Sequence, residues 1–289
     1  MRIGNLDGRL TLFRDGGAVD VAAASGELFP ADPQAVYRRW DEFCRWAAQN
    51  PGTPQPYSID QLGAPAPRPE QVFGIGANYR GHAAEGGLEV PEWPMVFTKY
   101  VSSFAAPTGV ITLPTDTVDW EVELVVVVGR KAFHVPAEHG WSYVAGLTLG
   151  QDLSERTTQL LGQLPQMSMG KSFPGFSPTG PYLVTPDEFD DPENLQLSCL
   201  LNEDVMQKAS TADLVHTVPK LIAELSSVLP LSPGDVIFTG TPEGVGTTRK
   251  PPRYIQPGDV LVSRLDGVGE LRHTFVAASP QTPSPRKDA

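Results

Sequence analysis

Two glutamates, Glu121 and Glu123, lie one residue apart in the segment DWEVELVVVVG, whose other positions from Trp120 to Val128 are apolar. The β-branched residues predict a buried strand, and strand alternation then places both carboxylates and Val125 on one face. Two buried neighbouring anions repel and lose hydration, so one must hold a proton or a cation must lie between them. A divalent metal meets this demand. Alternatively, the strand could lie at the edge of a sheet, where its glutamates face solvent or pair with Lys or Arg. The two glutamates alone do not decide between a metal site and such an edge strand.

Asp152 follows the apolar segment YVAGLTLGQ and offers a third carboxylate. It could serve as a helix cap. As a third oxygen ligand beside Glu121 and Glu123 it would instead complete a three-carboxylate site with positions left for water and substrate. Such ligands favour Mg²⁺ or Mn²⁺, and Ca²⁺ accepts similar ones. Zinc is disfavoured, because no His or Cys has the spacing typical of zinc ligands.

His82 and Glu85 lie three residues apart in the stretch NYRGHAAEGG, and on a helical turn they would share one face. A carboxylate that faces an imidazole orients the ring and raises its basicity, as a general base near neutral pH requires. A solvated surface contact is the ordinary alternative for such a pair. Because glycines bound the stretch, it could also act as a lid.

Two loops add a cation and possible anion-binding groups. Lys171, in SMGKSFPGFSPTGP, could stabilise an oxyanion during a reaction, or simply neutralise a structural carboxylate. The loop TGTPEGVG offers a small anion the hydroxyls of Thr239 and Thr241 and backbone N–H groups, that of Gly240 among them. Neither a P-loop nor a dinucleotide-binding fingerprint is present, since the required lysine and third glycine are missing.

The elements that must position these residues are mostly strands. The 28 glycines and 29 prolines are spread along the chain, which favours many short strands joined by turns. Apolar patterns predict short strands within 1–24 with a turn at 15–17, then strands at 71–75, 120–128, 143–149, 195–201, 235–238 and 260–265. Helices are predicted at 33–50, behind Asp32 as N-cap, and at 211–229.

The chain divides at a Pro-rich stretch, GAPAPRPE, at residues 63–70. We therefore expect a small N-terminal α+β domain over 1–66, a β-rich α+β catalytic domain over 67–276, and a disordered tail over 277–289.

Charge and cysteine content narrow the class of protein. The net charge of −12 and the pI of about 4.8 argue against a basic nucleic-acid footprint. Only Cys44 and Cys199 are present, which excludes a disulfide framework and favours a reducing compartment. No signal core or membrane-spanning apolar run is found. We expect a cytoplasmic protein with neither nucleic acid nor membrane as a partner.

Five segments in this order, GANYRGHAAE, WEVELVVVVGR, QDLSERTTQ, GKSFPGFSPTGP and GDVIFTGTPEGVG, resemble the fumarylacetoacetate hydrolase family over about residues 70–276. The resemblance implies a mixed β-sandwich roll, a small variable N-terminal domain and a homodimer. The chain departs from the family at two places. It has Ser-Glu-Arg-Thr at 154–157 where Ser-Ala-Arg-Asp is common, and Asn-Glu-Asp at 202–204 where Asn-Gly-Glu is common.

The resemblance also implies roles for the residues singled out above. The three carboxylates Glu121, Glu123 and Asp152 correspond to the family's divalent-metal ligands. His82 and Glu85 match its lid dyad, and Lys171 matches the lysine that stabilises an enolate or oxyanion. By the same resemblance, Arg156 and Gln159 form a pair that positions the substrate. Thr241, with Gly240 beside it, binds the carboxylate of the substrate.

The function predicted from these residues and the resemblance is cleavage of a carbon–carbon bond in a small anionic 2,4-dioxo acid of the acylpyruvate type. A metal-bound enolate would be the intermediate, with His82 generating hydroxide and Lys171 holding the departing enolate. Two alternatives stay open on the same site: a decarboxylase, hence a lyase, or an isomerase of oxo and hydroxydienoic acids. A non-catalytic, metal-stabilised binding protein is the alternative of another class.

Overall fold

The computed structural model describes residues 1–50 and 52–279, so most of the tail predicted at 277–289 lies outside the described residues. The strands are β1 (Arg2–Leu6), β2 (Arg9–Arg14), β3 (Gly17–Asp20), β4 (Leu62–Gly63), β5 (Val72–Gly76), β6 (Met95–Thr98), β7 (Phe104–Ala105), β8 (Thr108–Leu113), β9 (Val118–Asp119), β10 (Val122–Val128), β11 (Val144–Gln151), β12 (Ser154–Glu155), β13 (Ser177–Val184), β14 (Gln196–Leu201), β15 (Asp204–Ser210), β16 (Val236–Phe238), β17 (Val260–Leu265) and β18 (Gly269–Ala277). The α-helices are α1 (Val21–Ala24), α2 (Trp40–Gln49), α3 (Arg80–Glu85), α4 (Arg156–Gln159), α5 (Met167–Gly170) and α6 (Val218–Val228).

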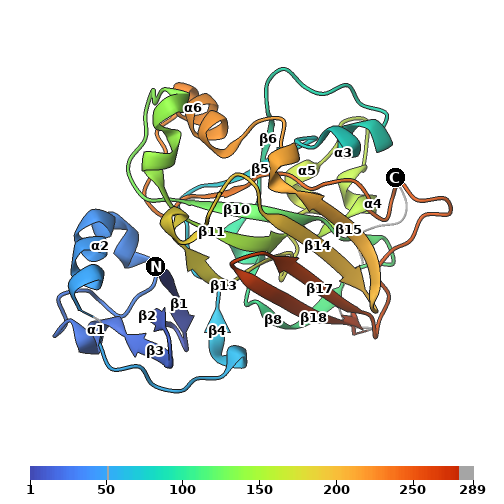
Figure 1. The fold of residues 1–289 in the computed structure, drawn as a ribbon. Helices are drawn as coiled ribbons and strands as arrows, with labels where there is room; N and C mark the ends of the chain where they lie inside the picture. The colour runs from blue at the N-terminus through green and yellow to red at the C-terminus, as the bar shows by residue number, and fades with distance from the viewer. Residues whose placement is uncertain (51, 280–289) are drawn as a thin grey trace.

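Two open sheets form the body of the molecule (Figure 1). The larger follows the order β3-β2-β1-β13-β11-β10-β16-β5-β6, and the smaller follows β15-β14-β17-β18-β8. Most neighbouring strands are antiparallel, but β16 pairs with β5, β18 with β8, and β13 with β7, in parallel. The fold is therefore the mixed, β-rich α+β arrangement predicted from the sequence.

Strand β10 is buried on both faces, because each face packs against a different layer. Leu124 and Val126 belong to the core shared with the smaller sheet, whereas Val125 and Val127 belong to the core shared with Phe43 of α2. A strand covered on both sides needs an almost continuous apolar run, which β10 has. The same alternation places Glu123 on the face of Val125, as predicted.

All six strands predicted at residues 71–265 are present, with small shifts at their ends. The strand predicted at 120–128 begins only at Val122, since β9 ends at Asp119 and a break separates the two. The helix predicted at 211–229 was too long: α6 begins at Val218, with Pro219 in its first turn, where proline is favoured.

The helix predicted at 33–50 divides into a 3₁₀ segment, Ala35–Arg39, followed by α2. Asp32 accepts a hydrogen bond from the backbone N–H of Gln34, so it caps the turn before this segment and not the α-helix itself. The predicted turn at 15–17 is confirmed, because it joins β2 to β3.

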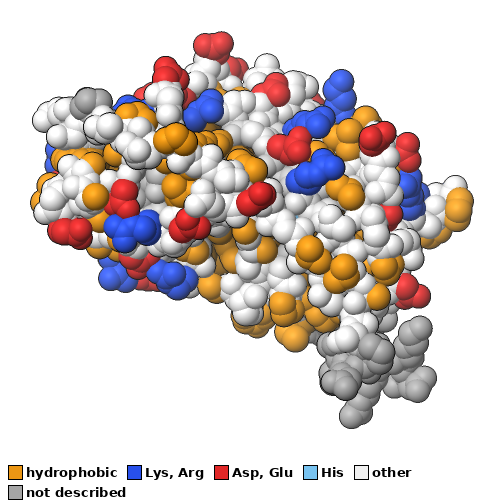
Figure 2. All heavy atoms as spheres, turned by 90° about the horizontal axis from the view of Figure 1, so that it is seen from below, with side chains coloured by type: hydrophobic (Ala, Val, Ile, Leu, Met, Phe, Trp, Pro, Cys, Tyr) orange, Lys and Arg blue, Asp and Glu red, His pale blue; other side chains and the backbone are white. Residues whose placement is uncertain are grey.

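The N-terminal strands are continuous with the larger sheet. Strand β1 pairs with β13, where Arg2 faces Val184 and Ile3 faces Leu183, and the elements before residue 66 lie along one side of the molecule (Figure 1). A domain boundary at 66/67 stays a prediction. Seen from below, acidic and basic side chains are interspersed on the surface (Figure 2). Within the described part of the chain, no helix combines the length and hydropathy needed to cross a membrane.

Candidate active site

The three predicted metal-ligand carboxylates converge where β10 begins and β11 ends. The two strands are antiparallel, with Val122 opposite Gln151, so Glu121 and Glu123 lie beside Asp152. One oxygen of each residue lies within 4.8 Å of the others, and all three are buried. Since β10 lies between β11 and β16, the alternative of an exposed edge strand is wrong.

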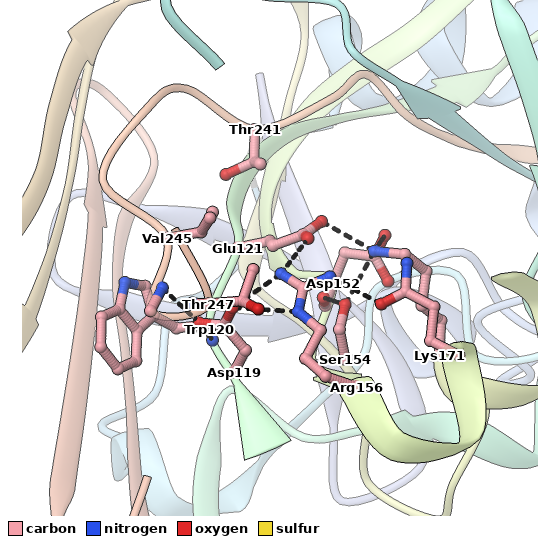
Figure 3. Close-up of polar contacts among 12 residues, drawn as sticks. Asp119, Trp120, Glu121, Asp152, Ser154, Arg156, Lys171, Thr241, Val245 and Thr247 are labelled. Carbon is pink, nitrogen blue, oxygen red and sulfur yellow. Dashed lines mark hydrogen bonds and ion pairs between the residues drawn. The ribbon is translucent and has the colours of Figure 1, made fainter. Parts of the chain in front are cut away.

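Two lysine ammonium groups contact this carboxylate cluster. Lys171 Nζ donates to Glu121 Oε2 and Asp152 Oδ2, both at 2.7 Å, and to Ser154 Oγ at 2.8 Å (Figure 3). Lys99 Nζ donates to the other oxygen of Asp152 at 2.5 Å. Lys99 was not predicted as a site residue, because a lone lysine ordinarily indicates an exposed position.

Arg156 bridges two acidic residues next to the cluster (Figure 3). Its Nε and Nη2 donate to Asp119 Oδ2 at 3.0 and 2.7 Å, and Nη2 also donates to Glu121 Oε1 at 2.7 Å. Nη1 donates to Gln159 at 2.7 Å, so the predicted positioning pair is in contact. Burial disfavours the charge of Arg156, but Asp119 and Glu121 outweigh burial and raise its pKa. Asp119 was likewise not predicted as a site residue. Its carboxylate holds the guanidinium of Arg156 in place.

The two glutamates of the cluster differ in charge state. Burial disfavours ionisation of both, but Lys171 and Arg156 outweigh burial at Glu121 and lower its pKa. At Glu123, Asp152 and Glu121 add to the effect of burial and hold the pKa well above its usual range. In the absence of a metal, these surroundings favour the ionised form of Glu121 and disfavour ionisation of Glu123. Three buried carboxylates whose oxygens lie close together fit a hard divalent cation.

Asp152 does not cap a helix. Glu155 caps α4 instead, accepting hydrogen bonds from the backbone N–H groups of Thr157 at 2.9 Å and Thr158 at 2.7 Å. Glu155, one of the two residues of this segment that depart from the common family pattern, therefore has a local structural role, and both oxygens of Asp152 contact the lysines.

The dyad lies on α3. His82 Nδ1 is 2.8 Å from Glu85 Oε1, while Glu85 Oε2 accepts hydrogen bonds from Gly244 N at 2.9 Å and Thr248 Oγ1 at 3.1 Å. Burial raises the pKa of Glu85, but these hydrogen bonds and His82 outweigh it, so the pKa is lowered and the carboxylate is ionised. Because Nδ1 faces this carboxylate, Nε2 is the nitrogen available to a substrate.

A cavity of about 100 Å³ brings the two groups of residues together. Its polar lining consists of His82, Glu121, Arg156, Gln159, Lys171 and Thr241. Ile75, Ala77, Leu88, Met95, Phe97 and Met167 form its apolar wall. A cavity well below the several hundred Å³ of sites for drug-sized ligands suits a short acid.

The loop at 239–246 contacts β10 beside the site. Gly240 N donates to Glu123 Oε2 at 2.8 Å. The hydroxyls of Thr239 and Thr241 donate to the carbonyls of Leu124 at 2.9 Å and Val122 at 3.0 Å. These groups therefore hold the strand that carries the glutamates, and only Thr241 lines the cavity. That Thr241 and Gly240 bind a substrate carboxylate stays a prediction.

Comparison with known proteins places the chain in a family. The model of the fumarylacetoacetate hydrolase C-terminal domain matches residues 71–276. The chain is 41% identical over 215 residues to the mitochondrial oxaloacetate tautomerase of Rattus norvegicus, covering 74% of this chain and 68% of that protein. The fumarylacetoacetate hydrolase domain-containing protein 2 homolog of Dictyostelium discoideum is 39% identical over 214 residues and 70% of each chain.

Solved structures show the same fold. A Mycobacterium smegmatis protein provisionally named HpcE has a TM-score of 0.93 and 50% identity over 96% of this chain and 100% of its own. Maleylpyruvate hydrolase from Sphingobium sp. SYK-6, in complex with manganese(II) and pyruvate, has a TM-score of 0.79 and 28% identity over 96% and 100%. These relatives include enzymes, so the alternative of a non-catalytic binding protein is set aside.

Proposed function

Because the chain belongs to the fumarylacetoacetate hydrolase family, we propose that it is a divalent-metal-dependent tautomerase that interconverts the keto and enol forms of a short 2-oxo acid such as oxaloacetate. The observation that carries this proposal is the cavity of about 100 Å³ in which His82, Glu121 and Lys171 face one space. The 41% identical relative named as an oxaloacetate tautomerase supports this choice among the reactions of the family.

Glu121, Glu123 and Asp152 are the residues that would hold the metal. Their oxygen ligands favour Mg²⁺ or Mn²⁺, and a relative binds manganese(II). A divalent cation bound there acts as a Lewis acid that polarises the oxo group of the acid.

His82 moves the proton in this proposal. Its Nε2 accepts a proton from the carbon next to the oxo group, and Glu85 holds the ring through Nδ1. The protonated His82 then gives this proton to the oxo oxygen and returns to its neutral form, so the enol has the same composition as the keto acid and no co-reactant is consumed. Burial disfavours the charge on Lys171, but Asp152 and Glu121 outweigh burial and raise its pKa, so its ammonium stabilises the developing oxyanion.

A kinetic assay with oxaloacetate and Mg²⁺ tests this proposal. We expect the purified protein to accelerate keto–enol interconversion only when the metal is present. His82→Gln should retain metal binding and lose the acceleration. Equal rates with and without metal, or an unchanged rate in His82→Gln, would contradict the proposal.

Hydrolysis of an acylpyruvate is the second candidate. The wall formed by Leu88, Met95 and Phe97 suits an uncharged acyl group, and a 28% identical relative is a maleylpyruvate hydrolase. Product analysis by NMR separates the reactions. Hydrolysis yields two acids, decarboxylation releases carbon dioxide, and tautomerisation yields only an isomer.

We also propose that the protein is cytoplasmic and forms a homodimer. Its substrate would be a small anionic oxo acid. Strand β6 is an edge of the larger sheet, and its Met95 and Val96 are exposed, which a second copy would cover. Light scattering of the wild type and of Val96→Lys tests this, since the variant should dissociate to monomers. A monomeric wild type would contradict it.

A further inference from the structure

Lys99 is a buried lysine that contacts the site without lining the cavity. Its ammonium has three N–H donors, and the structure gives each an acceptor. They are Asp152 Oδ1 at 2.5 Å, the Lys171 carbonyl at 2.5 Å and the Phe176 carbonyl at 3.2 Å. Its side chain is fully buried. Lys99 is therefore committed to the protein and has no donor left for a substrate.

Lys171 has a different set of partners, although it contacts the same carboxylate. Its acceptors are all side chains, those of Glu121, Asp152 and Ser154, and it lines the cavity. The two oxygens of Asp152 are thus divided, with Oδ1 held by Lys99 and Oδ2 held by Lys171. A cation that enters the carboxylate cluster can displace Lys171, but the two backbone carbonyls keep Lys99 in place.

The chain around Lys99 also holds the segment that carries Lys171. Thr98 N donates to Ser168 Oγ at 3.3 Å, and Tyr100 N donates to Ser172 Oγ at 3.0 Å. Lys99 lies between these contacts and binds the carbonyl of Lys171 itself. One lysine therefore joins the end of β6 to a metal-ligand carboxylate and to the backbone of the catalytic lysine.

We infer that Lys99 is a positioning residue that presents Oδ2 of Asp152 to the metal and fixes the backbone of Lys171. This inference rests on the metal-dependent function proposed above. If Lys99 acted only through its charge, its removal would strengthen cation binding, because one positive charge would be lost from the neighbourhood of the metal. If it acts by positioning, its removal weakens metal binding, as the loss of partners that orient metal ligands does, by about 10–100-fold.

Lys171→Met is the matched control, because it removes the same charge from the same carboxylate. Isothermal titration calorimetry with Mn²⁺ alone, in the absence of substrate, should show unchanged or tighter binding in Lys171→Met. Lys99→Met should bind Mn²⁺ about 10–100-fold more weakly than the wild type. The inference would be overturned if Lys99→Met and Lys171→Met changed the affinity for Mn²⁺ in the same direction and to the same extent.

Lys99→Gln and Lys171→Gln provide a second pair if Lys99→Met does not fold. The amide of Gln can still donate to one of the acceptors, so Lys99→Gln should fold, and it should bind Mn²⁺ more weakly than Lys171→Gln. Equal affinities in the Gln pair would also overturn the inference. A wild type that fails to bind Mn²⁺ would instead contradict the proposed metal-dependent function, so the two failures are distinguishable.

Discussion

The carboxylate cluster between β10 and β11 and the dyad on α3 each place one residue, Glu121 and His82, in the lining of the same cavity, but their surroundings differ. Asp152 is fully buried, and its oxygens, like those of Glu121, contact cationic side chains contributed by distant segments. His82 and Glu85 are about one-fifth exposed, with side-chain values of 21% and 20%, on a helix of six residues. The core thus fixes the cluster, whereas a few contacts hold the dyad. Substitutions should therefore separate metal binding and stability from proton transfer.

The largest expected effect is that of Glu121→Gln on the cluster. The loss of a ligand removes several kcal/mol of charge stabilisation, so metal-dependent turnover should fall on the order of 10³-fold. Because the change leaves Lys171 and Arg156 with one buried anion fewer, unfolding should become easier by about 3–5 kcal/mol. Steady-state kinetics and urea unfolding measure the two effects. The exposed Glu138→Gln is the control, and full turnover in Glu121→Gln would refute the role of the cluster.

His82→Asn should affect the dyad alone. Loss of the general base should lower kcat by about 10²-fold or more, while the affinity for Mn²⁺ stays within about twofold. His139→Asn, a substitution at an exposed histidine, serves as the control. A marked loss of Mn²⁺ affinity in His82→Asn would show that the two halves of the cavity are not separable.

The pH dependence of folding stability offers a further comparison with the cluster and the dyad. A buried histidine outside both regions, His273, also changes stability as the pH changes. Burial lowers the pKa of His273 to about 4, although the Ala106 carbonyl opposes this shift. Below its usual pKa of about 6.5, the unfolded chain binds a proton that the folded chain does not. The contribution of neutral His273 to the free energy of unfolding is therefore complete above pH 6.5. It falls by up to about 3 kcal/mol as the pH decreases toward 4.

His273→Gln removes this titration and can keep the hydrogen bond to the Ala106 carbonyl, which is 3.0 Å from His273 Nε2. Urea unfolding of both proteins between pH 7 and about 4 measures the difference. The carboxylate cluster titrates in both the wild type and His273→Gln, so its effect cancels in the difference between their free energies of unfolding. Parallel pH profiles would show that His273 is not responsible for the loss.

The smallest expected effect concerns stability in Glu123→Gln. The raised pKa of Glu123 favours its neutral form in the metal-free protein, and Gln has nearly the same shape and no charge. The free energy of unfolding should therefore change by less than about 0.5 kcal/mol, in contrast to Glu121→Gln. Chemical denaturation in the presence of a chelator measures it. A destabilisation as large as that of Glu121→Gln would show that Glu123 is ionised.

The sequence predicted the parts of the fold that depend on local pattern. The apolar run of β10 and the period-2 placement of Glu123 follow from strand geometry, and both are confirmed. The helix ends were predicted less well. Residues 211–217 have an apolar pattern compatible with a helix, but contacts such as that of Val215 N with the Asn78 carbonyl hold them in a different conformation.

The residue types alone predicted the candidate site only where they are unusual in their surroundings, whereas the roles of Arg156, Gln159 and Thr241 came from the family resemblance. Carboxylates in an apolar strand indicate chemistry because their burial is unfavourable without a partner. Lys99 and Asp119 gave no such signal, since each lies among ordinary neighbours and only long-range contacts bury it. The opposite pKa shifts of Glu121 and Glu123 depend on contacts with distant residues, so the local pattern could not have predicted which of the two has the raised pKa.

The most direct test is calorimetry with oxalate, which resembles the enolate of a 2-oxo acid, in the presence and absence of Mn²⁺. We predict that the wild type binds oxalate only when Mn²⁺ is present, and that Glu123→Gln, which keeps the fold, does not bind it under either condition. Equal oxalate binding with and without the metal, or no binding by the metal-loaded wild type, would contradict a metal-dependent enolising site on β10 and β11.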